Sequence, residues 1–232
     1  MKTIGLLGGT GWSSTITYYK MLNEHIAQRL GGYHSARIIL RSIDYHDIMI
    51  SYGKDHEKVA SLLKEELQSL IDCHPDSILI CCSSLHRYYD MIKKEIGSSI
   101  PVFHAVHLVA QHLLQRKAKS VLLLATVFTM EDGFFAKILE DKGIEVIIPG
   151  SKDRLMMQKI HAELMQNIVT KEAREYFKKL IQQYTTVDAV VLGCTEYPLV
   201  VDETNSILPI IDPVVLQVKS AVDDALTGLN LT

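Results

Sequence analysis

The chain has 232 residues, and its 24 Lys and Arg residues against 27 Asp and Glu residues leave a formal net charge of −3. Because both signs are mixed along the chain, the sequence offers no basic face for nucleic acid and no polybasic anchor for a membrane. No apolar run approaches the roughly 18 residues that a membrane helix needs. The start is too poor in apolar residues for a secretory signal, and the four cysteines form no disulfide framework, so we expect a cytoplasmic protein.

Short apolar runs alternate with helical patterns along the chain. The runs that we expect to form strands are Thr3–Leu7, Ala36–Leu40, Ser77–Cys81, Val121–Ala125 and Ala189–Leu192. They are continuous rather than alternating, which is typical of a parallel sheet covered on both faces. Strands that alternate with helices predict an α/β fold.

Two of the helices between these strands have clear signals. The first begins after Gly11, where Ser13 or Ser14 is expected to cap it, and Gly31 and Gly32 are expected to end it. The second is amphipathic, with apolar residues spaced three to four apart between Val59 and Leu70.

The chain contains a weak internal repeat. Residues 76–84 and 188–196 both consist of an aspartate, an apolar strand, a cysteine six positions on, and a hydroxyl residue, at a separation of 194 − 82 = 112. Residues 6–10 match residues 122–126 at a separation of 116. Chance similarity between apolar strands is the alternative. A true repeat predicts two pseudo-symmetric lobes, each a mostly parallel sheet flanked by helices, with the active site in the cleft between them.

The repeated cysteines, Cys82 and Cys194, follow strands at strand-to-helix turns, the edge of an α/β sheet where ligands bind. A helix N-terminus favours the thiolate form of a cysteine. Two such groups on opposite sides of one carbon suit inversion, because one thiolate removes the α-proton and the other thiol delivers a proton to the opposite face. A cysteine is more often a small buried hydrophobe, and we assign Cys73 and Cys81 to that class.

Groups suited to a substrate carboxylate surround the two cysteines. The expected substrate-binding hydroxyls are those of Thr10, Ser83, Ser84, Thr126 and Thr195, together with backbone N–H groups of the turns. Thr10 and Thr126 are expected to hold the same position in the two lobes. His86 and Glu196 are expected to orient or polarise the thiols; the alternatives are a surface histidine and a helix-start cap.

Several motifs resemble the aspartate racemase branch of the Asp/Glu racemase superfamily. They lie at residues 5–15 with Tyr18 and Tyr19, and at residues 29–35, 42–45, 126–130 and, most specifically, Gly193-Cys-Thr-Glu196. The resemblance implies a racemase of aspartate or glutamate that uses no pyridoxal phosphate and no metal, and that usually forms a homodimer. It also implies a first lobe of residues 1–100 plus 209–232 and a second lobe of residues 101–208.

The sequence departs from this family in two places. The first cysteine motif, normally Cys-Asn-Thr-x-His, reads Cys82-Ser-Ser-Leu-His86, so a serine replaces an amide that helps to hold the substrate. By the resemblance, the side-chain pocket falls at Tyr52 and Leu155, and neither supplies a cation; Arg154 or Lys159 would have to compensate. A neutral amino acid is therefore the alternative substrate.

Other classes of function fit less well. A dinucleotide oxidoreductase would use the glycines at 5, 8, 9 and 11 and the Tyr89-x-x-x-Lys93 spacing, but an acidic residue about 20 positions on is missing. A zinc site from Cys82, His86, His104 and Cys194 lacks familiar ligand spacing. A decarboxylase or isomerase of the same superfamily, or an inactive amino-acid-binding protein, remains open, although two retained cysteines favour racemisation.

Overall fold

The computed structural model describes residues 1–229, which divide into two compact units. The first unit comprises residues 1–105 and the C-terminal segment from Val214, and the second comprises residues 106–213. The lobe boundaries expected from the resemblance, at residues 101 and 209, lie five residues earlier in both cases (106 − 101 and 214 − 209). In the described part of the chain, no helix combines the length and the apolar character needed to cross a bilayer.

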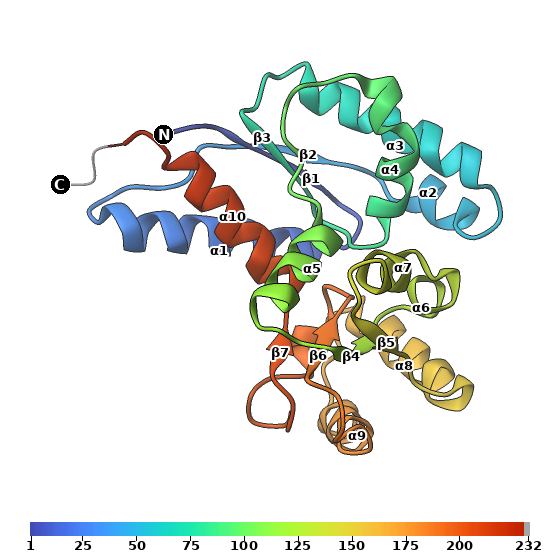
Figure 1. Ribbon diagram of the computed structural model, residues 1–232. Coiled ribbons are helices and arrows are strands. Elements are labelled where there is room, and N and C mark those ends of the chain that lie inside the picture. Colours follow the sequence, from blue (N-terminus) through green and yellow to red (C-terminus); the bar gives the residue numbers. More distant parts are fainter. Residues whose placement is uncertain (230–232) are drawn as a thin grey trace. The chain divides into compact units, whose positions relative to one another are not determined.

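The sheet of the first unit consists of parallel strands in the order β2-β1-β3. These strands are β1 (Ile4–Gly8), β2 (Ile38–Ser42) and β3 (Ser77–Ile80). Helices α1 (Trp12–Leu30) and α10 (Pro213–Ala225) lie on one face of the sheet, and α3 (His56–Ile71) and α4 (Leu85–Ile96) lie on the other (Figure 1). The short helix α2 (His46–Ser51) precedes α3.

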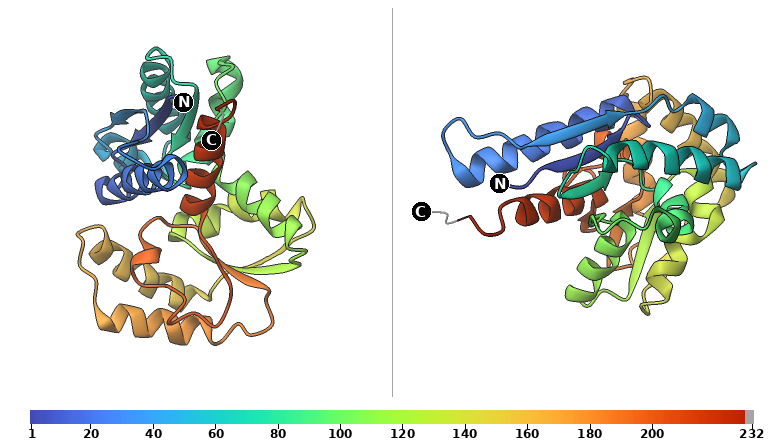
Figure 2. Two further views of the ribbon diagram at one scale, coloured as in Figure 1. Left: turned by 90° about the vertical axis from the view of Figure 1, so that its left-hand side faces the viewer. Right: turned by 90° about the horizontal axis from the view of Figure 1, so that it is seen from above.

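The main core of the first unit lies where α1 and α10 meet the sheet. Leu6 of β1, Leu22 and Ile26 of α1, and Val218 and Val222 of α10 are all fully buried there. Figure 2 shows these two helices from two further sides. Segments almost 200 residues apart in the sequence therefore share one apolar core, and burial of this kind contributes about 25 cal/mol per Å² of apolar surface.

The second unit has parallel strands in the order β5-β4-β6-β7. The strands are β4 (Ser120–Leu124), β5 (Glu145–Ile147), β6 (Ala189–Leu192) and β7 (Ile210–Ile211). The helices are α5 (Ala105–Gln115), α6 (Val127–Asp132), α7 (Phe134–Glu140), α8 (Ser151–Leu164), α9 (Lys171–Ile181) and the 3₁₀ turn η1 (Tyr197–Leu199). The rings of Phe177 on α9 and Tyr197 on η1 are buried with their centres 4.9 Å apart.

The predicted α/β fold with two parallel sheets is confirmed, and each of the five expected strands exists within two residues of its expected limits. Strands β5 and β7 were not expected, because runs of three and two residues at the edges of a sheet carry little pattern. The expected continuous burial fails in β2, where Leu40 is 46% exposed, because β2 is an edge strand.

Helix α1 corrects a second expectation. Gly11 is its N-cap, and no side chain caps it, so the prediction of a cap by Ser13 or Ser14 is wrong. Both serines lie inside the helix, and Ser14 is buried. A glycine is acceptable at this position because it leaves the first N–H groups of the helix accessible. Gly31 ends the helix as expected.

The internal repeat is visible in equivalent hydrogen bonds of the two units. The Asp76 carboxylate accepts from the N–H of Thr3 at 2.6 Å, before β1, and the Asp188 carboxylate accepts from the N–H of Lys119 at 2.6 Å, before β4. The N–H of Ile78 donates to the carbonyl of Pro101, and that of Val190 donates to the carbonyl of Pro209, both at 2.9 Å.

These bonds show why each repeat begins with an aspartate. Its carboxylate joins the start of one strand to the start of the neighbouring strand, and hydrogen bonds from the N–H groups of Lys119 and Ser120 hold the pKa of Asp188 below its usual range. The two units therefore share equivalent hydrogen bonds between the starts of neighbouring strands.

Candidate active site

Cys82 lies just beyond the carboxyl end of β3, where the chain turns into α4. The N–H of Cys81 donates to the carbonyl of Leu7 at 2.9 Å, which ties the end of β3 to β1. Cys82 is half-buried, and its Sγ lies 3.3 Å from the Oγ of Ser84. Ser84 is the N-cap residue of α4 but makes no side-chain cap, so its hydroxyl faces the thiol instead. The predicted strand-to-helix turn at Cys82 is thus in place. Ser84 was expected to bind substrate, and its contact with the thiol was not predicted.

Tyr52 lies in the surroundings of this thiol. Its ring packs edge-on against Tyr88, with the centres 5.4 Å apart, and its hydroxyl oxygen is shielded from solvent. Burial raises the pKa of Tyr52 well above its usual value, the charge of Cys82 raises it further, and a hydrogen bond with Ser84 acts in the opposite direction. The side chain of Tyr52 is therefore a neutral phenol and not a phenolate, and its place in a side-chain pocket stays a prediction.

Cys194 lies at the corresponding place in the second unit, between β6 and η1. Its Sγ donates to Oε2 of Glu196 at 3.0 Å, and the hydroxyl of Thr195 donates to the same oxygen at 2.9 Å. Cys194 and Glu196 are 5% and 4% exposed, so this bond is largely shielded from water. The Tyr197 hydroxyl donates to the carbonyl of Ala125 at 3.1 Å and so fixes the turn against β4.

The two thiols have different partners. Cys82 faces the neutral hydroxyl of Ser84, whereas Cys194 faces the carboxylate of Glu196. Two adjacent anions would repel each other, whereas the hydrogen bond from Sγ to Oε2 places a proton between the two groups. Glu196 contacts the thiol of Cys194, and although it is the N-cap residue of η1 its side chain makes no cap bond there. That it polarises the thiol stays a prediction.

His161 was missed by the sequence analysis. It lies near the end of α8, and its Nε2 is 3.7 Å from Oε2 of Glu196. Its ring packs edge-on against Tyr197, with the centres 6.3 Å apart. The only signal in the sequence was a histidine on the half-buried face of an amphipathic helix, and such a position says nothing about which turn it meets in the fold.

The expected equivalence of Thr10 and Thr126 is wrong. The N–H groups of Cys81 and Gly193 donate to the carbonyls of Leu7 and Leu124, so Leu7 and Leu124 correspond. Thr126 comes two residues after Leu124, but Thr10 comes three residues after Leu7. The glycine-containing loop before α1 is longer than the loop before α6, which shifts the two threonines out of register.

The hydroxyls of these threonines also have structural partners. That of Thr10 is buried and donates to the carbonyl of Cys81 at 3.3 Å. That of Thr126 accepts from the N–H of Thr129 at 3.3 Å and so caps α6. Ser83 is buried beside Cys82. A role for these groups in binding substrate stays a prediction.

His86 is fully buried, so the alternative of a surface histidine is wrong. Its Nε2 accepts from the N–H of Ala105 at 3.3 Å, and Nε2 of Gln217 on α10 lies 3.4 Å away. Gln217 in turn accepts from the Tyr18 hydroxyl at 2.5 Å. His86 thus links α4, α10 and the first residue of α5, and the expectation that it orients Cys82 stays a prediction.

Two residues considered for the side-chain pocket lie on α8 of the second unit. Leu155, expected in the side-chain pocket, is 60% exposed on α8. The neighbouring Arg154 is already engaged, because its guanidinium donates to Glu131 at 3.1 Å and to the carbonyl of Pro149 at 2.7 Å. Any new anion would have to compete with these partners.

The other two cysteines differ from each other. Cys81 is buried as expected, and burial together with the neighbouring Cys82 raises the pKa of its thiol. Cys73 is exposed at the end of α3, so its assignment to the buried class is wrong. Its Sγ donates to the carbonyl of Ser69 at 3.4 Å. Neither has the paired environment of Cys82 or Cys194.

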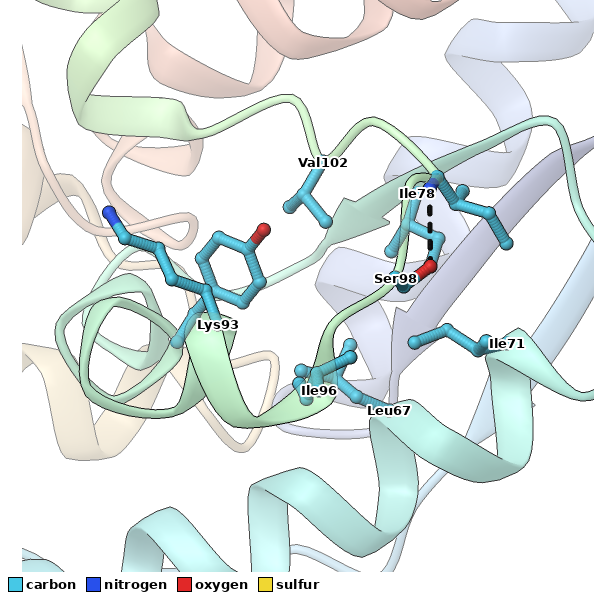
Figure 3. A pocket seen from close by; sticks show the side chains of 9 residues that line it. Leu67, Ile71, Ile78, Lys93, Ile96, Ser98 and Val102 are labelled. Carbon is cyan, nitrogen blue, oxygen red and sulfur yellow. Dashed lines mark hydrogen bonds between the residues drawn. The ribbon is translucent and has the colours of Figure 1, made fainter.

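A small pocket of the first unit lies between α3, α4 and β3 (Figure 3). Its lining is mostly aliphatic, with Tyr89 and Lys93 from α4 beside it. The N–H of Ile100 donates to Oγ of Ser98 at 3.1 Å in its wall. None of the residues expected to bind substrate lines this pocket, and its aliphatic lining does not suit a charged amino acid.

Several known proteins are similar to this chain in sequence and fold. The broad specificity amino-acid racemase RacX of Bacillus subtilis (strain 168) is 25% identical over 229 residues, which cover 94% of this chain and 96% of RacX. The crystal structure of an Asp/Glu racemase candidate from Yersinia pestis matches 98% of this chain and 100% of its own, with 35% identity and a TM-score of 0.87. The structure of an aspartate racemase homologue from Pyrococcus horikoshii OT3 matches 97% and 99%, with 27% identity and a TM-score of 0.83.

The fold and these likenesses define a class of enzyme, the racemases, which are isomerases. A family model described as Asp/Glu/Hydantoin racemase matches residues 7–221. The chain therefore belongs to the Asp/Glu/Hydantoin racemase family, and the family and enzyme class predicted from the sequence are confirmed.

Proposed function

We propose that the protein racemises a free amino acid by two-base proton transfer, with Cys82 and Cys194 as the two bases. The observation that carries this proposal is the matched placement of the cysteines. Each follows the strand that pairs with the first strand of its unit, β3 with β1 and β6 with β4, and each thiol has a hydrogen-bonding partner. Membership of the family supports amino-acid racemase activity, but not a particular substrate or mechanism.

The reaction needs one thiolate and one thiol. The thiolate takes the α-proton and becomes a thiol, and the electron pair of the C–H bond stays on the α-carbon. The second thiol then gives its proton to the opposite face and becomes a thiolate. Catalysis in the reverse direction uses the exchanged forms, so no net proton is consumed. The hydroxyls of Ser83, Ser84 and Thr195 and the N–H groups of the turns are proposed to hold the substrate carboxylate.

We further propose that aspartate or glutamate is the substrate and that the reaction needs no pyridoxal phosphate, nucleotide or metal. The acidic assignment rests on the whole-chain likeness to the family. The independence of cofactors rests on a thiol pair that performs both proton transfers by itself. The homodimer implied by the resemblance stays a prediction, and the exposed apolar residues Trp12, Ile16 and Tyr19 on one face of α1 are the surface on which to look for it.

Deuterium exchange tests the activity and the substrate together. Protein dialysed against a chelator is incubated in D₂O with each enantiomer of aspartate, glutamate, alanine, serine and methionine, and α-deuteration and inversion are measured by NMR. We expect both with aspartate or glutamate, with a kcat/KM at least tenfold higher than for the neutral amino acids, which is about 1.4 kcal/mol of transition-state preference.

The same set of exchange measurements can contradict the substrate, the racemase activity and the independence of metal separately. A neutral amino acid that is preferred tenfold would exclude the acidic assignment. Failure of all five would favour the amino-acid-binding or decarboxylase alternatives. Loss of activity on chelation that zinc restores would contradict independence of metal. If Leu155 faces the side-chain pocket, Leu155→Lys is expected to raise activity on aspartate.

Glu196→Gln is expected to lower kcat/KM by roughly 10- to 100-fold, because the amide cannot take up the proton shared with Cys194. Enantiomers have equal free energies, so the loss must be the same in both directions. Glu196→Asp keeps a carboxylate and should recover part of the activity. Glu203→Gln, which changes an exposed carboxylate nearby in the chain, is the matched control. Unchanged kinetics of Glu196→Gln would show that the bond to Cys194 has no part in catalysis.

A further inference from the structure

Three side chains with good metal-ligand atoms meet at the end of β6. They are Sγ of Cys194, Oε2 of Glu196 and Nε2 of His161, and all three atoms lie within 4.8 Å of one another. The distance from Sγ to Oε2 is 3.0 Å, and that from Nε2 to Oε2 is 3.7 Å. All three residues belong to the second unit, so the cluster does not depend on the placement of the first. The cluster shares only Cys194 with the four zinc ligands considered from the sequence, which were Cys82, His86, His104 and Cys194.

We propose that these three side chains form a binding site for Zn²⁺, and that zinc bound there inhibits the enzyme reversibly by occupying the thiol of Cys194. Zinc binds thiolate sulfur at about 2.3 Å and imidazole nitrogen or carboxylate oxygen at about 2.0–2.2 Å, in tetrahedral geometry. The ligand atoms of such a site lie roughly 3.3–3.6 Å apart. The observed 3.0 and 3.7 Å bracket this range, and the third separation, from Sγ to Nε2, lies within 4.8 Å.

The surroundings of the cluster favour metal binding. Cys194 and Glu196 are almost fully buried, whereas the side chain of His161 is 22% exposed and leaves one side open to solvent. The Thr195 hydroxyl donates to Oε2 of Glu196 at 2.9 Å and so orients the carboxylate, as hydrogen-bonding partners of metal ligands do. The fourth position of the metal would be filled by water or by a substrate carboxylate.

Binding requires that the thiol lose its proton. The S–H bond of Cys194 breaks, the sulfur forms a bond to the metal, and one proton passes to solvent, so affinity should rise with pH. The resulting site combines Zn²⁺ with one thiolate, one carboxylate and one neutral imidazole, and has no net charge. Mg²⁺ should not bind, because it prefers an octahedral set of oxygen ligands.

Binding is tested on the chelated full-length protein without reference to activity. Titration with Co²⁺ should produce the near-ultraviolet absorption of a cobalt–thiolate bond at one equivalent, and added Zn²⁺ should abolish it. Cys194→Ala should lose this band, and His161→Ala should weaken Zn²⁺ binding at least tenfold in calorimetry. Cys82→Ala and His34→Ala, an exposed histidine, are the matched controls and should bind as the unaltered protein does.

The proposal that zinc inhibits the enzyme rests on the proposed function. The proposal that zinc binds at Cys194 does not, so the two can fail separately. Racemisation should fall with added Zn²⁺ at the concentration that displaces Co²⁺, and should not fall with Mg²⁺. A cobalt band that survives in Cys194→Ala, or no binding by the unaltered protein at 100 µM Zn²⁺ (about −5.5 kcal/mol), would overturn the site. Metal binding in a protein without racemase activity would uphold the site and contradict the proposed function. Zinc bound at Cys194 with racemisation unaffected would overturn the inhibition.

Discussion

Cys82→Ala and Cys194→Ala are each expected to lower racemisation by roughly 100- to 10,000-fold in both directions, which is the contribution of a general acid or base. Inversion needs both a base and an acid, so the loss of either thiol stops the whole reaction. Serine in place of either cysteine should fail as well, since a hydroxyl is a far weaker acid than a thiol. Initial rates with each enantiomer, followed by circular dichroism of the substrate, measure the effect.

A second readout separates a catalytic role from a structural one. Each variant keeps one thiol, which can remove the α-proton of one enantiomer and return a deuteron to the same face. We therefore expect the two variants to retain slow exchange without inversion, each with a different enantiomer. Cys73→Ala, which changes an exposed cysteine, is the control and should behave as the unaltered protein. Near-normal racemisation by either variant, with the fold intact, would rule out the two-base mechanism.

Gly9→Ala is expected to destabilise the protein by more than about 3 kcal/mol. The backbone of Gly9 has a φ of +92°, and an added Cβ would lie 2.2 Å from the carbonyl oxygen and 2.5 Å from the nitrogen of Ile43. Both contacts are with backbone, so no side-chain rotation relieves them, and the strained φ adds about 1–2 kcal/mol. Urea unfolding followed by far-ultraviolet circular dichroism measures the change in the free energy of unfolding.

Gly97→Ala is the matched control for this substitution. Gly97 also has a positive φ, +60°, but an added Cβ meets nothing within 4 Å. Gly97→Ala should therefore lower the free energy of unfolding by only about 1 kcal/mol, the penalty for an alanine in this backbone conformation. Equal losses at the two positions would show that the contact with Ile43 does not limit the loop after β1.

The sequence was sufficient for the parts of the fold that carry strong local patterns. The buried strands β1, β3, β4 and β6 are continuous apolar runs, and the repeat around Cys82 and Cys194 indicated that both cysteines end equivalent strands. The short edge strands β5 and β7 were not predictable, since their pairing comes from neighbours distant in the chain and not from their own residues.

The site was predictable only where it is local. Ser84 and Glu196 lie two residues from their cysteines, and the turn brings them together directly. His161 approaches Glu196 only because α8 packs beside η1. This is a tertiary contact, and no local pattern in the sequence indicates it. The error over Thr10 has the opposite cause, since a loop length that looked equivalent in the two halves proved to differ after β1 and β4.

The return of α10 to the first unit has a consequence for synthesis on the ribosome. The first 105 residues emerge with all three strands of their sheet, but the face of that sheet against α1 lacks the apolar residues of α10, among them Val218 and Val222. The second unit is contiguous, from 106 to 213, and can close its core while the last helix is still in the exit tunnel. The part of the protein made first is therefore the part completed last, and a truncation near the C-terminus damages the N-terminal unit.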